Sequence, residues 1–347
     1  MGELTTPLCK ALGIEHPVFS VGFGSAAGPE LAAAVSNAGG FGVLGASGYK
    51  PEHVRRAIAD TRPLTDCPFG INFIIAIESE EDIPYLQQLI AVASAEHVAA
   101  VVLFWGDPHP YVPIAHEHGA RVFIQVGSVA EAEAAVEAGV DVVIAQGVEA
   151  GGHVRGTESI WSLLPAVVNG VDPVPVLASG GIGDGAGLAR ALRLGAQGVS
   201  LGTRFVASEE AFVHPEYKRR VVQARAADAV YSSLFDVGWP DAPHRARHNR
   251  ALAEWEAAGR PPSGSRPGEG TSIGHLRRLY GQFYEWRRYA TGMATPDFDG
   301  DVEYAPMWAG ESVEVVNDIK PAGQIVRDLV REAEQALREP SGSAARA

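Results

Sequence analysis

The sequence predicts an α/β protein: a (β/α)8 TIM barrel that carries a mainly helical inserted second domain. Three observations predict it, namely eight short apolar runs, Ala-rich helical stretches between them, and a change of composition after Phe205. Each run is an almost continuous series of Val, Ile, Leu or Phe, as in parallel strands that are buried on both faces. Eight such units fit a barrel better than a doubly wound sheet, which usually has five or six strands.

The expected strands are residues 18–21, 42–45, 69–73, 100–104, 122–126, 142–145, 174–178 and 198–201. Helices are expected between them. One covers residues 29–37 and stops at Ala38-Gly39-Gly40, and Ser128 is a candidate N-cap for another over residues 129–137. A long amphipathic helix over residues 319–339, with Pro321 near its start, should return to close the barrel.

The chain is expected to form two units. Residues 1–206 and 306–347 form the barrel, and residues 207–305 form a helical insertion that covers the active site. The insertion is inferred from its amino-acid composition. This segment is rich in Arg, Trp, Tyr and Pro and includes a Gly-, Pro- and Ser-rich stretch at residues 259–270. Four tryptophans, Trp239, Trp255, Trp286 and Trp308, could line the site or pack in a core.

Composition excludes several classes of protein. A hydrophobic content of 46% is that of a globular chain, not of a disordered one. The formal net charge of −14 argues against nucleic acid or an anionic membrane as a partner. Two distant cysteines, Cys9 and Cys67, indicate neither disulfides nor a zinc site, and no His/Asp/Glu group has metal-ligand spacing, so no metal is expected. Without a signal peptide or spanning segment, we expect a cytoplasmic protein.

Glycine-rich loops follow the seventh and eighth expected strands. The first reads Ser179-Gly180-Gly181-Ile182-Gly183-Asp184-Gly185, and the second reads Leu201-Gly202-Thr203-Arg204-Phe205. In barrels of this type the loops at these two places commonly bind phosphate through backbone N–H groups, and glycine lets the backbone come close. The pair predicts a phosphorylated cofactor or substrate, although glycines can also serve only to make tight turns.

The loop after the sixth strand holds the best acid or base candidate. His153 follows Gly151 and Gly152 at the expected barrel mouth, and an ordinary histidine titrates near neutral pH, which suits a general base. A purely structural histidine remains the alternative. Glu149 is the competing group on the same loop. The other histidines, among them His244, lie in helical or polar contexts.

Two amides end otherwise apolar strands. Asn72 and Gln125 can both donate and accept hydrogen bonds, which suits the edge of a planar heterocycle such as a flavin, or phosphate oxygens. The loop that contains Gly22, Phe23 and Gly24 would then pass close to such a ring. Each amide could instead satisfy the backbone of a loop.

Taken together, Ala150-Gly151-Gly152-His153 and the two glycine-rich loops resemble, in order and spacing, the nitronate monooxygenase family, formerly called 2-nitropropane dioxygenases. Residues 17–24, 31–40, 70–73 and 318–322 also match, and the likeness is weakest from about 207 to 305. The resemblance implies non-covalently bound FMN. It places Gly180, Gly181, Gly202 and Thr203 at the phosphate, Asn72, Gln125 and Gly152 along the rest of the cofactor, and His153 at the catalytic position.

The resemblance also implies the reaction. Family members oxidise a nitronate, with FMN and O2, to a carbonyl compound and nitrite, while the histidine hydrogen-bonds the nitro group or takes the α-proton of a neutral nitroalkane. Enoyl or quinone reductases that use NAD(P)H have a similar Gly-Gly-His loop, so a flavin reductase is the first alternative. A flavin-binding protein without turnover is the second.

Overall fold

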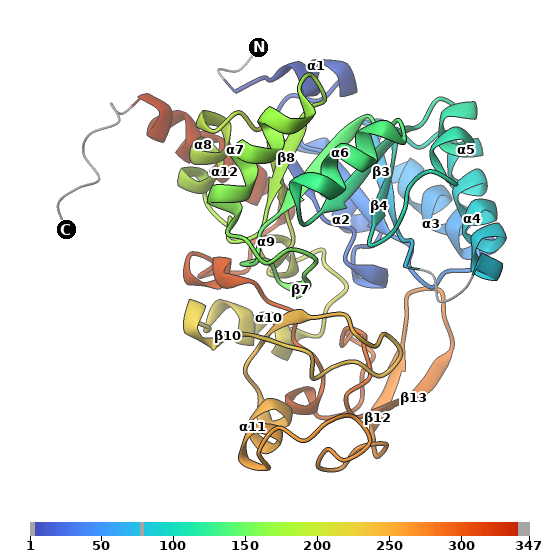
Figure 1. Cartoon of the computed structure of the whole chain (residues 1–347), viewed down its shortest axis with the longest axis vertical. Helices are drawn as coiled ribbons and strands as arrows, with labels where there is room; N and C mark the ends of the chain where they lie inside the picture. Colours follow the sequence, from blue (N-terminus) through green and yellow to red (C-terminus); the bar gives the residue numbers. More distant parts are fainter. Residues whose placement is uncertain (1–3, 77–79, 339–347) are drawn as a thin grey trace.

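The computed structural model describes residues 4–76 and 80–338. At its centre eight parallel strands pair in the order β1-β9-β8-β6-β5-β4-β3-β2 (Figure 1). They are β1 (Val18–Ser20), β2 (Gly42–Gly45), β3 (Phe69–Ile74), β4 (Ala100–Phe104), β5 (Arg121–Val126), β6 (Val142–Gln146), β8 (Val176–Ser179) and β9 (Gly198–Leu201). The ring closes because the Ser20 amide donates to the Phe41 carbonyl (3.0 Å) and the Phe41 amide donates to the Val18 carbonyl (2.9 Å). The predicted barrel is confirmed.

Helices surround the strands on the outside of the ring. They are α2 (Pro29–Asn37), α3 (Pro51–Thr61), α4 (Ile83–Ala95), α5 (Val112–Glu117), α6 (Val129–Glu137), α7 (Ile160–Val171), α8 (Gly185–Arg193) and α12 (Ala322–Arg338). The short helix α9 (Thr203–Val206) directly follows β9 at the barrel mouth. The predicted bounds of α2 and α6 are confirmed, and the Ser128 hydroxyl accepts the Glu131 amide at 3.2 Å as an N-cap. Helix α12 packs on α8 and α2, while residues 339–347 lie outside the described part of the chain. None of the described helices has the length and apolar character needed to cross a membrane.

The amino-terminal end of the barrel is filled. Helix α1 (Pro7–Leu12) contributes Leu8, Cys9 and Leu12 to a buried cluster of inward-facing strand residues. Inside the ring, Phe19, Phe41 and Phe123 pack with ring centroids 5.5 to 6.2 Å apart. Side chains that fill one end of a barrel leave the opposite end, where the strands have their carboxyl termini, as the place for a cavity.

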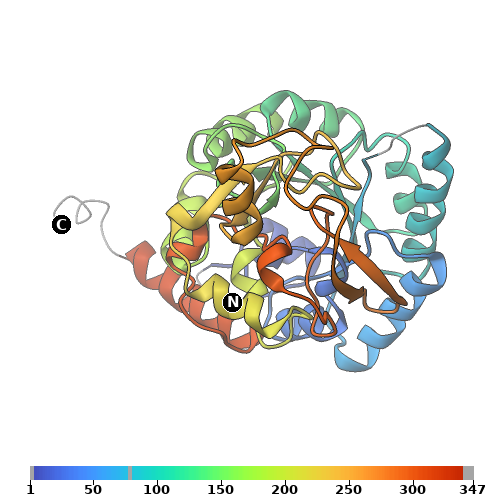
Figure 2. The same cartoon turned by 90° about the horizontal axis from the view of Figure 1, so that it is seen from below.

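The segment over residues 207–305 lies on the carboxyl-terminal side and crosses the barrel mouth (Figure 2). The expectation that it is mainly helical is not confirmed. It contains α10 (Pro215–Val222) and α11 (Arg250–Ala257), together with β10 (Ala229–Ser232), β11 (His244–Arg247), and the hairpin of β12 (Ser272–Arg277) and β13 (Phe283–Arg287). Aromatic residues such as Phe283, Tyr284 and Trp286 favour strands, and the frequent Gly and Pro interrupt helices. The division of the chain at 206 and 306 stays a prediction.

Candidate active site

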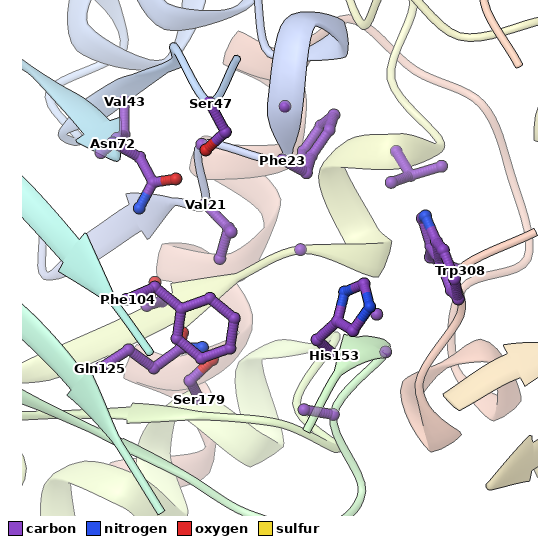
Figure 3. A pocket seen from close by; sticks show the side chains of 18 of the residues that line it. Val21, Phe23, Val43, Ser47, Asn72, Phe104, Gln125, His153, Ser179 and Trp308 are labelled. Carbon is purple, nitrogen blue, oxygen red and sulfur yellow. The ribbon is translucent and has the colours of Figure 1, made fainter. Parts of the chain in front are cut away.

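One cavity of about 290 Å³ opens at the carboxyl ends of the barrel strands. All the residues that the sequence placed at the site line it. They are Gly22, Phe23, Gly24, Asn72, Gln125, Gly151, Gly152, His153, Ser179, Gly180, Gly181, Gly202 and Thr203. In Figure 3, His153 and Trp308 lie on one side of the space, and Asn72, Gln125 and Phe104 lie on the other. The fold therefore brings the predicted residues together, while the role of each stays a prediction.

His153 is held by its backbone. With Gly152 it forms the two-residue strand β7 (Gly152–His153), which pairs antiparallel with β11, so that His153 lies opposite His244. The Gln146 side chain donates to the His153 carbonyl (2.9 Å) and accepts the Arg155 amide (3.0 Å). Gln146 is buried at the end of β6. Its two hydrogen bonds therefore hold the backbone of the His153 loop against the barrel.

The imidazole of His153 lies among aromatic rings. Its centroid is 4.1 Å from that of Trp239, at an interplanar angle of 33°, and 5.2 Å from that of Trp308. The Nε2 atom is buried and has no hydrogen-bond partner among the described residues. Because buried polar atoms are almost always hydrogen-bonded, an unpaired nitrogen beside a cavity is the feature expected of a group that contacts a ligand.

Burial is the main electrostatic influence on His153. Together with a smaller contribution from nearby His244, it lowers the pKa of the imidazole to about 3. His244 is buried as well, and burial lowers its pKa to about 4. Both rings are therefore neutral at pH 7. This corrects the expectation that His153 titrates near neutrality, and it favours a hydrogen-bonding role over that of a strong base.

The pH dependence of turnover should reflect this low pKa. Because His153 keeps its neutral form as the pH falls from 8 to 5, kcat/KM for a nitronate added in its anionic form should show no inflection near pH 6.5. The measurement is a rapid-mixing assay across that range. A clear decrease below pH 6.5 that the His153→Gln variant lacks would contradict the neutral-imidazole assignment.

The two glycine loops present free backbone donors to the cavity. Among the described residues, nothing accepts a hydrogen bond from the amides of Gly180, Gly181, Gly202 or Thr203. Gly180 and Gly181 have φ values of +100° and +69°, a region that side chains disfavour. The Thr203 hydroxyl oxygen accepts the Gly310 amide at 3.0 Å, so its own proton is available to a ligand. This donor set fits a phosphate group.

The two strand-end amides differ in their bonding. Asn72 is buried and donates through Nδ2 to the Val102 carbonyl (3.0 Å), which leaves Oδ1 as an acceptor. The Gln125 side chain lines the cavity and makes no hydrogen bond to any residue that the structure describes. Both amides can thus bind the polar edge of a heterocycle, which is what a flavin ring requires.

Glu149, the competing acid or base on this loop, forms its hydrogen bond outside the cavity. Glu149 Oε2 accepts the Ile160 amide at 3.0 Å at the start of α7, and Glu149 does not line the cavity. No described Asp or Glu does so, and Arg278 is the single fully charged side chain among the described lining residues. In a chain of net charge −14, a cavity without carboxylates favours an anionic ligand.

The sequence left open which of the four tryptophans line the site. Trp239 and Trp308 line the cavity, whereas Trp286 is buried in a separate core and Trp255 packs at the edge of another. Sequence reasoning missed His244 and Arg278. His244 was expected in a helical or polar context, but it is buried in the strand β11. Both were missed because the pairing of β11 with β7 and the place of the hairpin follow from contacts between segments far apart in the sequence.

Comparison with known proteins decides the family. A sequence profile described as nitronate monooxygenase matches residues 5–332. The chain belongs to the nitronate monooxygenase family. It is therefore an oxidoreductase of that family, and the resemblance read from the motifs is confirmed.

Three relatives show the range of the family. A nitronate monooxygenase of Neurospora crassa is 32% identical over 377 residues, covering 96% of this chain and 91% of that protein. A (3aS,4S,5R,7aS)-5-hydroxy-7a-methyl-1-oxo-octahydro-1H-indene-4-carboxyl-CoA dehydrogenase of Mycobacterium tuberculosis is 30% identical, covering 95% and 96%. The crystal structure of a nitroalkane oxidase from Streptomyces ansochromogenes has a TM-score of 0.75 at 26% identity, covering 94% and 98%.

Proposed function

We propose that this member of the nitronate monooxygenase family binds FMN and oxidises alkyl nitronates with O2 to a carbonyl compound and nitrite. The observation that carries the proposal is the cavity, which combines unpaired backbone amides and a neutral, unpaired histidine with no lining carboxylate among the described residues. These features suit two anions, the cofactor phosphate and the nitronate.

The residues present fit FMN. Gly180, Gly181, Gly202 and Thr203 would hold the phosphate through N–H groups, and Asn72 and Gln125 would hydrogen-bond the polar edge of the ring system. Gly22, Phe23, Gly24, Gly151, Gly152 and Ser179 would line the remainder of the cofactor site. Bound FMN would supply the electron acceptor for the nitronate.

His153 would bind and orient the substrate. A neutral imidazole can donate one N–H to a nitronate oxygen without requiring a proton from solvent. Trp239 and Trp308, packed on the ring, exclude water from around this hydrogen bond and so strengthen it. With a neutral nitroalkane the same ring would have to act as a base, and its low pKa makes it a weak one. A nitronate is therefore the better substrate.

A second function is favoured by one comparison. The Mycobacterium tuberculosis relative is a dehydrogenase of an acyl-CoA compound, and its similarity spans nearly the whole chain. An NAD(P)H-dependent flavin reductase acting on a quinone or an enoyl thioester is accordingly the alternative, with NAD(P)H as a partner in place of O2.

One anaerobic experiment separates the two functions. The FMN-loaded protein is mixed in a stopped-flow instrument with ethyl nitronate, and separately with NADH and NADPH. We expect the nitronate, and neither nicotinamide, to bleach the flavin absorbance. Bleaching by NAD(P)H alone would indicate the reductase, and no bleaching by any of them would indicate a flavin-binding protein without turnover. Protein that gains no flavin absorbance on incubation with FMN would contradict the cofactor assignment.

A further inference from the structure

Arg245 is a buried arginine beside the candidate active site. It belongs to β11 and lies opposite Gly152 in the β7–β11 pair, next to the pairing of His244 with His153. It is 8% exposed, and it is not among the described residues that line the cavity. Because burying a charge costs free energy unless the group is well hydrogen-bonded, the bonds of Arg245 indicate what it does here.

The guanidinium of Arg245 joins three segments of the chain. Nε (3.2 Å) and Nη2 (2.8 Å) both donate to the carbonyl of Val148, in the loop that follows β6. Nη1 donates to the Ala229 carbonyl at the start of β10 (2.8 Å). Nη2 also forms an ion pair with Oε1 of Glu311 (3.2 Å), the first residue of a short 3-10 helix over Glu311–Glu314. Two of these four interactions go to a single carbonyl of the loop.

That carbonyl belongs to the His153 loop, which we define as residues 147–153. Buried side chains hold this loop at two places: Arg245 holds it at Val148, and Gln146 donates to the His153 carbonyl (2.9 Å). A group that acts on a substrate has to be held to within about 0.5 Å, and supporting hydrogen bonds of this kind supply that precision. The direction of the imidazole therefore depends on both ends of the loop.

The carboxylate partner of the guanidinium connects the same loop to the glycine-rich loop after β9. The Glu311 amide donates to the Glu149 carbonyl (2.9 Å), and the Gly310 amide donates to the Thr203 hydroxyl (3.0 Å). Gly151 packs on this segment backbone against backbone, since a Cβ added to Gly151 would lie 2.4 Å from the Gly310 nitrogen. A shift of residues 310–311 would therefore be passed directly to the loop that carries the histidine.

We propose that Arg245 is a positioning residue, which fixes the place of His153 at the cavity. It acts through the backbone of the His153 loop and through the segment that starts at Glu311. The catalytic part of this inference rests on the proposed function, because it takes His153 as the group that orients the nitronate. The structural part, that the guanidinium holds the loop in place, is independent of which reaction the protein catalyses.

The first measurement is kcat/KM for ethyl nitronate at saturating FMN. Arg245→Met keeps the length of the side chain and removes both bonds to Val148. We expect a loss of about 10-fold to 100-fold, since a displacement of about 1 Å at a reacting group can lower the rate by that much. Arg245→Lys keeps the charge, but its compact ammonium cannot replace the planar fork of the guanidinium, so it should lose less activity than Arg245→Met.

Arg288→Met is the matched control. Arg288 is also 8% exposed, it forms an ion pair with Glu254, and it is not a described lining residue of the cavity. The variant should keep a kcat/KM close to that of the wild type, even if its thermal stability falls as far as that of Arg245→Met. An equal loss of kcat/KM in the two methionine variants would overturn the proposal.

A double-mutant cycle separates positioning from a general loss of structure. If Arg245 acts through His153, removing it adds little once the imidazole is gone. The double variant of His153→Ala and Arg245→Met should then match the kcat/KM of His153→Ala within about 2-fold, whereas independent effects would multiply. Losses that multiply would overturn the proposal, because Arg245 would then affect turnover by another route.

Amide hydrogen exchange tests the loop without a substrate. In Arg245→Met, peptides that cover residues 147–155 should exchange about 10-fold to 100-fold faster than in the wild type, the effect of losing hydrogen bonds from a charged group. Peptides from α3 and α4 should keep their wild-type rates, and Arg288→Met should leave the loop unchanged. Unchanged exchange in the loop of Arg245→Met would overturn the proposal.

The exchange measurement also keeps this inference apart from the proposed function. If the wild type oxidises no nitronate, faster exchange confined to residues 147–155 would still support the positioning role of Arg245. If Arg245→Met yields no folded protein, Arg245→Lys carries both measurements, with the same expected directions and smaller effects. Wild-type exchange and wild-type kcat/KM in Arg245→Lys would then overturn the proposal.

Discussion

Replacing His153 by alanine is expected to lower kcat/KM for a nitronate by about 10²-fold to 10⁴-fold, the usual effect of losing a positioned acid, base or donor. The reason is that the imidazole presents the unpaired Nε2 beside the cavity, while Glu149, the competing group on the loop, is already bonded to the Ile160 amide. The measurement is steady-state oxygen consumption with ethyl nitronate.

Two controls accompany His153→Ala. FMN content should stay at the wild-type level, because the backbone of β7 is held by Gln146 and β11 and not by the imidazole. His153→Gln should recover part of the lost rate with a nitronate, since an amide can donate a hydrogen bond. Wild-type kcat/KM in His153→Ala would assign the residue to structure and withdraw it from the site.

The second large effect is expected on FMN binding, when a carboxylate is introduced at Gly202. An ideal Cβ at Gly202 meets only Val21 atoms, at 3.9 and 4.0 Å, and the φ of −96° is accessible to any residue. Gly202→Asp should therefore fold, yet place a negative charge beside the proposed phosphate site. Two like charges about 4 Å apart at an effective dielectric constant near 20 repel by about 4 kcal/mol. We expect the Kd for FMN to rise by about 10²-fold to 10³-fold.

Gly202→Asn is the matched control, with almost the same volume and no charge. Fluorescence titration of FMN into the flavin-free proteins should show a much smaller increase in Kd for Asn than for Asp. Because the effect is electrostatic, riboflavin, which lacks the phosphate, should bind both variants alike. Equal loss in Asn and Asp would assign the effect to steric blocking, and unchanged FMN binding in Asp would remove the phosphate from this loop.

The barrel could be predicted from the sequence because its signals are local. In the sequence, buried parallel strands appear as continuous runs of apolar residues. A helix cap such as Ser128 before α6 bonds to a residue only three positions away. The segment over residues 207–305 could not be predicted in the same way. Its strands β10 and β11 are short, and their pairing depends on partners outside any local window, so the helical expectation was not confirmed.

The same distinction between local sequence signals and long-range contacts applies to the residues of the candidate site. His153, Gly180, Gly181 and Gly202 belong to motifs that are recognised by their order and spacing, and all four residues line the cavity. Trp239, His244 and Arg278 belong to no motif. Trp239 and Arg278 line the cavity, and His244 lies beside His153, because the segment across the mouth folds back, pairs β11 with β7 and places the hairpin turn against Gly48.

By itself, the sequence determined the (β/α)8 architecture, the family and the set of residues at the strand ends, because strand burial and loop glycines are properties of neighbours along the chain. Only the tertiary structure decided the electrostatics of the cavity. The pKa of His153 depends on its burial beside Trp239 and Trp308, and whether Arg278 has an ion-pair partner among the described residues depends on which carboxylates the fold brings near. Desolvation and ion pairing are set by distances in space, and a linear order of residues does not contain them.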